Sequence, residues 1–320
     1  MVRIAQVGTG HGHALGKWRA LCANADVEAV GIYESESFSR NRPESFDGAR
    51  WFPSLAAIFD DPTIDAVAVE VRNHASLPLA AQAVAASKHV WFDKPAGDDW
   101  PGFVELIRQA AERRLHVQMG YMFRYSPGFE QVTSMARSGE LGEVFAVRAH
   151  MSTNVGLAER REQSRHLGGI LYDLGGHMLD QMVWLLGEPV RVSTTLRNDA
   201  TPHLPEYADN TVCVLEFPHA LAVLDIAAME ARPAARRFEV YGAHGSAVLE
   251  AFDPVRTLRV ARDNSERVEN LEPVERQTLY ERELAAFVGV LRGERAPDRP
   301  AEHDLIVQRT LLRSTGRLSD

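Results

Sequence analysis

The stretch HVWFDKP, from His89 to Pro95, decides the fold. It is a short apolar run of residues that favour β-structure, and it ends at a charged pair, Asp93 and Lys94. Such a run is typical of a parallel strand buried on both faces, and ligands of parallel sheets bind at the carboxyl ends of the strands. We therefore expect Lys94 at the edge of a crevice, in an extended turn that Pro95 restricts. The alternative is a surface lysine just past a strand end.

Composition limits the class of protein. At 320 residues the chain exceeds what one hydrophobic core usually holds, which predicts two domains. A hydrophobic content of 45% with 25% charged residues is typical of a soluble globular protein. The net charge of -9 argues against nucleic acid or an anionic membrane as a partner. Cys22 and Cys213 lie far apart, which suits a cytoplasmic protein, and we find no signal peptide and no membrane span.

The N-terminal region carries a second informative stretch. Residues 3–7 form a short apolar strand, which GTGHGH at residues 8–13 and then a helical pattern follow. Gly8 and Gly10 match the G-x-G of a dinucleotide-binding fingerprint, in which glycine lets backbone amides approach a pyrophosphate at a helix N-terminus. His13 stands at the third position, where the fingerprint has glycine or alanine.

A second strand, VEAVGIYES, ends at Glu34. An acidic side chain about 20 residues beyond the glycines accepts hydrogen bonds from the adenosine ribose and repels a 2′-phosphate. We therefore predict NAD, with NADP less favoured. The alternative is a solvated glutamate at a strand end, and Arg40 and Arg42 are close enough in sequence to weaken the preference.

Strand and helix patterns alternate as far as Met122. Further strands are predicted at 65–71, 89–92 and 116–122, a loop at 72–74, and helices at 54–61, 77–88 and 98–114, the last with Asp98 or Asp99 as N-cap. This alternation specifies a doubly wound parallel sheet, so the fold class is α/β. We place the first domain at residues 1–122.

The second domain, residues 123–320, has a different pattern. After a helix near 129–136, half-exposed strands are predicted at 143–151, 189–197, 210–217, 220–230, 236–242, 246–251 and 255–262. Strands in such succession indicate one open, mostly antiparallel sheet, with one face on a core and the other free to meet a partner. Amphipathic segments at 280–291 and 301–318 are predicted to be helices.

GGILYDLGGHMLDQMVWLLG, which starts at residue 168, is predicted to be a helix with an apolar stripe. Asp173, His177 and Asp180 fall at i, i+4 and i+7 on another face. Gly175 and the glycine after it should each cost about 1 kcal/mol relative to alanine, which suggests that a ligand or another backbone comes close there. An aspartate four residues before a histidine is also a common surface pair. We predict no metal site, because no second histidine stands at ligand spacing on this helix.

The family that the chain resembles is Gfo/Idh/MocA, the relatives of glucose-fructose oxidoreductase and inositol dehydrogenase. The resemblance rests, in order, on GTGHGH, Glu34, DAVAVEVRNH, HVWFDKP, GYMFRYSP and GGILYDLGGHMLDQ, which cover nearly the whole chain. It implies an N-terminal Rossmann domain and a C-terminal α/β domain whose open sheet often mediates oligomers, so we expect a homodimer or homotetramer. It also implies a nicotinamide cofactor and a sugar, polyol or cyclitol substrate.

The family's functional residues transfer by position. Its glutamate-lysine-proline motif falls on Asp93, Lys94 and Pro95, and its catalytic aspartate and histidine fall on Asp173 and His177. Together with the glycine-rich loop, Glu34 and the loop 72–74, these positions give the candidate cofactor-binding residues Gly8, Thr9, Gly10, His11, Gly12, His13, Glu34, Asn73, His74, Asp93, Lys94 and Pro95. The candidate substrate-binding residues are Lys94, Arg124, Asn154, Arg165, Asp173 and His177.

Three positions depart from the family pattern. Asp93 is one methylene shorter than the usual glutamate, and His13 replaces a small residue, so both bear on how the cofactor sits. Ser76 stands where many relatives carry histidine, which bears on the substrate side.

The implied chemistry assigns a role to each catalytic candidate. We expect His177 to accept the hydroxyl proton, since its unperturbed pKa is near neutral. Lys94 would stabilise the developing alkoxide or share the proton relay, and Asp173 would orient His177. Asn73 is expected along the cofactor, and Asp180 is a candidate for structural support of the helix.

Two other functions remain open. One is a redox-neutral enzyme that retains NAD while it hydrolyses or epimerises a sugar, and the other is a non-catalytic dinucleotide sensor. Specificity is expected from the loop 154–166, whose Arg160, Arg161 and Arg165 would suit a carboxylated or phosphorylated sugar. The same arginines also fit a solvated charged loop.

Overall fold

The computed structural model describes residues 1–35, 46 and 48–319. The chain forms two compact units, Met1–Met122 with Gln277–Leu305, and Phe123–Arg276 with Ile306–Asp320. The first predicted helix of the C-terminal pair therefore belongs to the first unit, although the sequence analysis assigned it to the second domain. Within the described residues, every helix is too short or too polar to cross a lipid bilayer.

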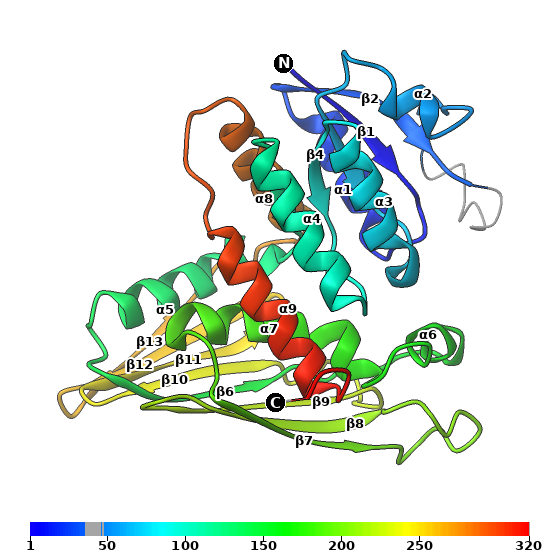
Figure 1. Cartoon of the computed structure of the whole chain (residues 1–320). Helices are drawn as coiled ribbons and strands as arrows, with labels where there is room; N and C mark the ends of the chain where they lie inside the picture. The colour runs from blue at the N-terminus through cyan, green and yellow to red at the C-terminus, as the bar shows by residue number, and fades with distance from the viewer. Residues whose placement is uncertain (36–45, 47, 320) are drawn as a thin grey trace. The chain divides into compact units, whose positions relative to one another are not determined.

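The first unit is built on a parallel sheet of five strands in the order β2-β1-β3-β4-β5 (Figure 1). These strands are β1 (Val2–Val7), β2 (Val27–Tyr33), β3 (Ala66–Val69), β4 (His89–Phe92) and β5 (Val117–Met119). All four residues of β3 and the last three of β4 are buried, as their apolar sequences predict. The predicted doubly wound parallel sheet is confirmed.

Five helices accompany this sheet in the described part of the first unit. They are α1 (Ala14–Ala23), α2 (Ala56–Phe59), α3 (Asn73–Ala85), α4 (Trp100–Glu112) and most of α8 (Arg276–Leu291). Asp99 is the N-cap of α4 and accepts a hydrogen bond from the Gly102 amide at 3.1 Å. The loop predicted at 72–74 is wrong in part, because α3 already begins at Asn73 and Arg72 occupies the extended N-cap position.

Helix α8 packs against α1 at Gly16. A Cβ at Gly16 would lie 2.5 Å from Cε2 of Tyr280, so only glycine allows this approach. The Gln277 side chain also donates to the Gly16 carbonyl at 3.1 Å. These contacts explain why α8 belongs to the first unit, and they could not be predicted from the local pattern of α8 alone.

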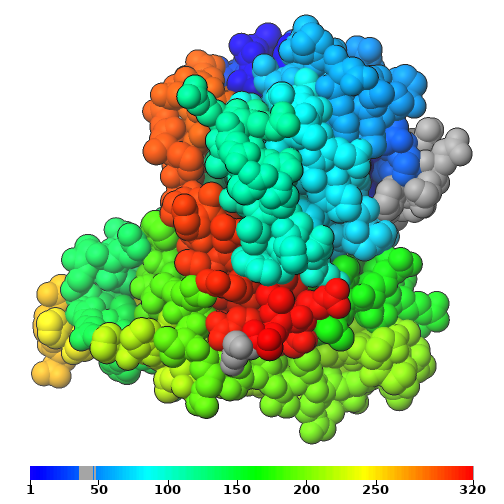
Figure 2. All heavy atoms as spheres, viewed as in Figure 1, coloured from blue at the N-terminus to red at the C-terminus, as the bar shows by residue number. Residues whose placement is uncertain are grey.

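The second unit is built on a sheet of eight strands in the order β13-β12-β11-β10-β6-β9-β8-β7. All its strand pairs are antiparallel except β6 with β9. The strands are β6 (Val144–His150), β7 (Arg191–Arg197), β8 (Asn210–Glu216), β9 (Leu221–Ala227), β10 (Arg237–Gly242), β11 (Gly245–Phe252), β12 (Val255–Arg262) and β13 (Ser265–Asn270). The sequence analysis missed β13, because its polar sequence SERVEN has no apolar face. Figure 2 shows the tip of the β12–β13 hairpin, in gold, at the edge of this unit.

Helices cover one face of this sheet (Figure 1). They are α5 (Pro127–Arg137) and α7 (Ile170–Leu186). The described part of the second unit also contains α6 (Leu157–Gln163) and most of both the 3₁₀ helix η2 (Met122–Tyr125) and α9 (Ala301–Ser314). The aromatic rings of Phe123, Phe129 and Phe252 contact one another in the core between α5, which carries Phe129, and β11, which ends at Phe252. The segment 154–166 was predicted to be a loop, but it contains α6.

The other face of the eight-stranded sheet is partly apolar and exposed. On β8, Cys213 and Leu215 are buried on the helix side, whereas Val212 on the opposite side is 41% exposed. On β9, Leu221 is 54% exposed. The predicted open sheet with one free face is therefore present in the described second unit.

Candidate active site

The loop after β1 requires glycine at position 8. Gly8 has φ of +94°, and a Cβ there would lie 2.3 Å from Cγ1 of Val71. The His11 amide donates to the Glu70 carbonyl at 2.9 Å, which fixes the loop to the end of β3. Helix α1 starts directly after His13. The loop amides thus lie at a helix N-terminus beside the carboxyl ends of the strands, an arrangement suited to a pyrophosphate.

A cavity of about 300 Å³ opens beside this loop. Its ten lining residues include Gly8, Val71 and Leu79, and Glu34 is the one charged residue among those ten. Oε2 of Glu34 accepts hydrogen bonds from the amide and the hydroxyl of Thr9 at 2.7 and 2.6 Å. A mostly apolar cavity with a fixed carboxylate at the loop fits an adenosine moiety with its ribose. Arg40 and Arg42 lie outside the described residues.

Asp93 and Lys94 follow β4 at the same edge of the sheet, and each is 3% exposed. Oδ1 of Asp93 accepts a hydrogen bond from the Lys94 amide at 2.7 Å. The peptide bond from Lys94 to Pro95 is cis. The side chain of Asp93 therefore holds the backbone from which the candidate catalytic lysine projects.

A network of buried charges that the sequence analysis missed surrounds Asp93. Nζ of Lys17 lies 2.9 Å from Oδ2 of Asp93 and 3.0 Å from Oε1 of Glu70. Nδ1 of His13 lies 3.0 Å from the same Asp93 oxygen, and Nδ1 of His11 lies 3.4 Å from it. A signal was present, because Lys17 falls on the buried stripe of α1 and Glu70 directly follows the apolar strand AVAV.

Burial and charge act in opposite directions on these groups. Burial alone would raise the pKa of Asp93, but the positive charges at His11 and Lys17 and the hydrogen bond with His13 outweigh it and hold that pKa well below its usual value. Burial lowers the pKa of His13 to about 4, so this imidazole is neutral near pH 7. For His11, the carboxylates of Asp93 and Glu70 outweigh burial and raise the pKa.

The network also bears on metal binding. The sequence predicts no metal, yet ligand atoms of His11, His13 and Asp93 lie within 4.8 Å of one another. Nζ of Lys17 is 2.9 Å from Oδ2 of Asp93, so its ammonium would repel a cation bound at that oxygen. The structure therefore gives a metal ion an unfavourable environment at these three residues.

In the second unit, α7 carries Asp173 and His177. His177 is 2% exposed and meets the ring of Phe123 edge-on at 5.1 Å between centroids. Oδ2 of Asp173 accepts a hydrogen bond from the Gln163 amide group at 2.9 Å, and Oε1 of Gln163 accepts one from the Tyr207 hydroxyl at 2.6 Å. Gln163 therefore holds Asp173, and Tyr207, 44 positions further along the chain, holds Gln163 in turn; the sequence analysis missed both residues.

Packing explains one glycine inside α7. A Cβ at Gly175 would lie 3.0 Å from Cδ1 of Leu171 and 3.4 Å from Cδ1 of Leu311, so Gly175 provides room for α9. Packing against α9 is therefore sufficient to explain why residue 175 is glycine, without the predicted approach of a ligand. One turn later, Asp180 is buried and bound to Arg124 at 2.6 and 3.0 Å, which agrees with a structural role for Asp180.

The other predicted site residues fall in several places. Asn73 and His74 lie in the first turn of α3, where the Ser76 hydroxyl donates to the Asn73 carbonyl at 2.8 Å. Asn154 forms an isolated bridge with Met229, and Arg165 is mostly exposed beside Glu162. Arg124, predicted to bind substrate, is held in its buried ion pair with Asp180. Lys94 lies in the first unit and His177 in the second.

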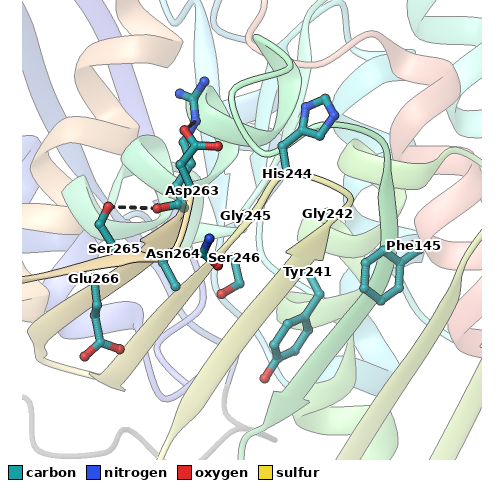
Figure 3. Close-up of a pocket in the computed structure, with 12 residues that line it drawn as sticks. Phe145, Tyr241, Gly242, His244, Gly245, Ser246, Asp263, Asn264, Ser265 and Glu266 are labelled. Carbon is teal, nitrogen blue, oxygen red and sulfur yellow. Dashed lines mark hydrogen bonds and ion pairs between the residues drawn. The ribbon is translucent and has the colours of Figure 1, made fainter.

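A second cavity, of about 470 Å³, lies among turns at one end of the eight-stranded sheet (Figure 3). Its lining includes Tyr241, His244, Asp263 and Asn264. The labelled side chains come from separate strands and turns and do not converge on one point (Figure 3). None of its twelve lining residues is a predicted site residue.

Fold and motifs together define the class of protein. A parallel sheet with a glycine-rich first loop and an acidic residue at the end of β2 is a dinucleotide-binding Rossmann fold. Residues 2–121 match the model of the oxidoreductase family with an NAD-binding Rossmann fold, and residues 129–248 match the Gfo/Idh/MocA C-terminal domain. The chain belongs to the Gfo/Idh/MocA family of oxidoreductases.

Individual relatives are distant. An uncharacterized oxidoreductase of Escherichia coli (strain K12), YdgJ, is 31% identical over 62% of this chain and 57% of its own length. Glucose-6-phosphate 3-dehydrogenase of Bacillus subtilis (strain 168) is 26% identical over 68% of this chain and 63% of its own length. The chain thus spans about three fifths of these curated relatives.

Solved structures share the fold over the whole chain. An oxidoreductase from Agrobacterium radiobacter, in complex with NAD+, L-tartaric acid and magnesium, has a TM-score of 0.84 and 17% identity over 99% of this chain and 96% of its own. At that identity the likeness shows a common fold alone.

Proposed function

We propose that this protein is an NAD-dependent dehydrogenase that transfers a hydride between a secondary alcohol of a sugar, polyol or cyclitol and the cofactor. The observation that carries the proposal is the carboxyl edge of the parallel sheet, where the Gly8 loop, Glu34 and Lys94 follow β1, β2 and β4. Membership of an oxidoreductase family supports it. The name of the Bacillus subtilis relative, glucose-6-phosphate 3-dehydrogenase, supports a sugar hydroxyl as the reacting group.

The residues of this chain would divide the chemistry between the two units. When bound, the nicotinamide would accept the hydride from the alcohol carbon. His177 would take the hydroxyl proton, with Asp173 orienting it while Gln163 holds Asp173. The Lys94 ammonium would stabilise the negative charge that develops on the alcohol oxygen. We propose that the first unit holds the cofactor and the second supplies substrate contacts, with Asn154 and Arg165 among the candidates.

For the cofactor we propose NAD in preference to NADP. The Glu34 carboxylate is held by two hydrogen bonds from Thr9 and is 6% exposed, so it cannot easily turn away from a ribose in the cavity. A 2′-phosphate at that place would meet its negative charge. Asn73 and His74 start α3 directly after β3, where they would reach along the cofactor.

We also propose that the protein forms a homodimer or homotetramer through the open face of the eight-stranded sheet. The exposed Val212 and Leu221 on that face support this association. The two cysteines are free thiols, which supports a location in the reducing cytoplasm.

The test begins with cofactor titration and ends with two variants. We expect NAD to bind more tightly than NADP by calorimetry, and a screen of sugars, polyols and cyclitols to give NADH absorbance with at least one of them. Lys94→Ala and His177→Ala should each lower turnover about 100-fold or more. Lys88→Met, which changes another buried lysine of the first unit, is the matched control and should retain turnover.

Other outcomes would point to the alternatives. Turnover within a few-fold of wild type in both variants would contradict the assigned roles. A redox-neutral enzyme would keep NAD through purification and release no NADH while it converts a sugar. Tight NAD binding without conversion of any compound would favour a sensor.

A further inference from the structure

The distribution of lysine in this chain is unusual. Of its 35 lysine and arginine residues, only three are lysine, at positions 17, 88 and 94. Each of the three is at most 3% exposed, and all belong to the first unit. A lysine ammonium is a compact point charge, whereas the arginine guanidinium is a broad planar group. A chain that otherwise uses arginine therefore keeps lysine where a small buried cation is required.

Lys17 is the lysine whose ammonium binds two carboxylates. Its Nζ is 2.9 Å from Oδ2 of Asp93, 3.0 Å from Oε1 of Glu70 and 4.3 Å from the centroid of the Trp91 ring. An ammonium with no exposed side-chain surface is tolerated only when such partners replace water. Without Lys17, the carboxylates of Asp93 and Glu70 would lose the cation that lies within 3.0 Å of an oxygen of each, and their mutual repulsion would be less compensated.

Asp93 connects the buried Lys17 ammonium to Lys94, the residue that follows Asp93 in the chain. Its Oδ2 faces Lys17, and its Oδ1 accepts the Lys94 amide hydrogen at 2.7 Å. A carboxylate held at both oxygens cannot rotate without losing one of the two contacts. A shift of the Lys17 ammonium would therefore move the Asp93 side chain and, with it, the backbone amide of Lys94.

Gly120, directly after β5, packs against Lys17 and Asp93. A Cβ at Gly120 would lie 2.9 Å from Nζ of Lys17, 3.0 Å from Cα of Asp93 and 3.1 Å from its Cγ. The end of β5 therefore touches both members of the ion pair. Gly120 therefore limits the space around the Lys17 ammonium on the side of β5.

We propose that Lys17 is a positioning residue for Lys94 and acts through Asp93. The inference rests on the proposed function only in treating Lys94 as catalytic. Lys88 provides the contrast, because its ammonium donates to the main-chain carbonyls of Asp61 and Ile64, at 2.5 and 2.9 Å. Lys88 thus has the burial of Lys17 without its link to Asp93.

The small number of lysines permits a test that needs no substrate. With ¹⁵N-lysine the wild type gives three backbone amide signals, and hydrogen exchange of each is followed separately. We expect exchange of the Lys94 amide to be roughly ten-fold faster in Lys17→Met, because the Asp93 acceptor loses its buried ion pair and keeps only the weaker contacts with His13 and His11 at that oxygen. The Lys88 amide, bound to the Ala83 carbonyl at 2.9 Å, is the internal reference and should keep its rate.

A double variant separates positioning from stability. Lys17→Met with Glu70→Gln removes one charge of each sign, so it should fold even where Lys17→Met alone does not. We expect this folded double variant still to show fast Lys94 exchange, because Asp93 has lost its ion pair with Lys17. Lys94 exchange within two-fold of wild type, or an equal acceleration of the Lys88 amide, would overturn the proposal.

Activity gives a second, independent readout. Once a substrate is known, the double variant should lose about 10- to 100-fold in kcat with little change in KM for NAD, since a displaced Lys94 affects the reacting oxygen. Lys88→Met should retain both constants. Unchanged kcat in the double variant would contradict the positioning role. If no substrate is found, the proposed function fails, and the exchange rates still decide whether Lys17 positions Lys94.

Discussion

At the level of single residues, burial changes the charge that a side chain carries. Glu283 on α8 has no exposed surface, and burial raises the pKa of its carboxyl to about 8, with Asp93 and Glu70 adding to the effect and Lys17 opposing it. The side chain is therefore mostly protonated near pH 7. Its neutral form completes the buried network around Lys17 without adding a third negative charge.

Glu283→Gln should alter how stability depends on pH. The folded pKa of about 8 exceeds the ordinary 4.5, so this group stabilises the fold fully below about 4.5, and that stability is lost as pH rises through about 8. Glutamine mimics the neutral acid, so the variant should lose less stability than wild type between about pH 6 and about pH 9. Thermal unfolding at both values measures this, with the exposed Glu281→Gln as control. An identical pH dependence in Glu283→Gln and wild type would contradict the buried neutral carboxyl.

Some site residues were predictable one at a time and others were not. Gly8, Glu34 and Lys94 stand directly after apolar strands, so strand ends in the sequence point to them. Lys17 and Glu70 interrupt apolar segments, but nothing local says that they meet. Lys17 precedes its partner Asp93 by 76 positions, and only the order of strands in the sheet brings the two together.

Among the secondary-structure elements, α7 is a helix whose buried face is not wholly apolar. Asp180 has no exposed side-chain surface, and the side chain of Arg124 is 3% exposed. Oδ1 of Asp180 accepts two hydrogen bonds from the Arg124 guanidinium. Its other oxygen accepts the Gln181 side-chain amide at 3.0 Å. The pair ties α7 to the 3₁₀ helix η2 and so fixes the rotation of the helix that carries Asp173 and His177.

Breaking this pair on one side should be costly. Asp180→Asn removes the negative charge 2.6 Å from the buried Arg124 guanidinium, so the free energy of unfolding should fall by about 3–5 kcal/mol. Asp180→Asn combined with Arg124→Met should recover much of that loss. Urea unfolding measures both. As control, Glu188→Gln breaks an exposed pair with Arg309 and should cost less than about 1 kcal/mol. Equal losses in Asp180→Asn and Glu188→Gln would contradict a buried ion pair.

Helices and strands whose apolar residues recur at a regular spacing were predicted well. The strands of both sheets and the helix α7 follow from local spacing, because burial of one face requires that spacing. The edge strand β13 was missed since both its faces are polar, and α6 was missed since a short charged helix has no long apolar stripe.

For the molecule as a whole, the open sheet face has a consequence for assembly. We expect the protein to be a dimer or tetramer in light scattering. Val212→Arg places a charge on the exposed face of β8 and should reduce the oligomer to a smaller species that remains folded. Val104→Arg, on α4 of the first unit, is the control and should leave the oligomer intact. A monomeric wild type, or an oligomer that Val212→Arg does not affect, would exclude this face as the interface.

Local sequence was sufficient to predict the two kinds of sheet, the glycine-rich loop and the family. Each of these predictions depends on residues within short segments of the chain. Local sequence was not sufficient for the packing of α8 with α1, the pairing of Arg124 with Asp180, or the contact between Lys17 and Asp93. Buried charges need partners, and those partners come from segments that are distant along the chain and become neighbours only when strands take their order in a sheet.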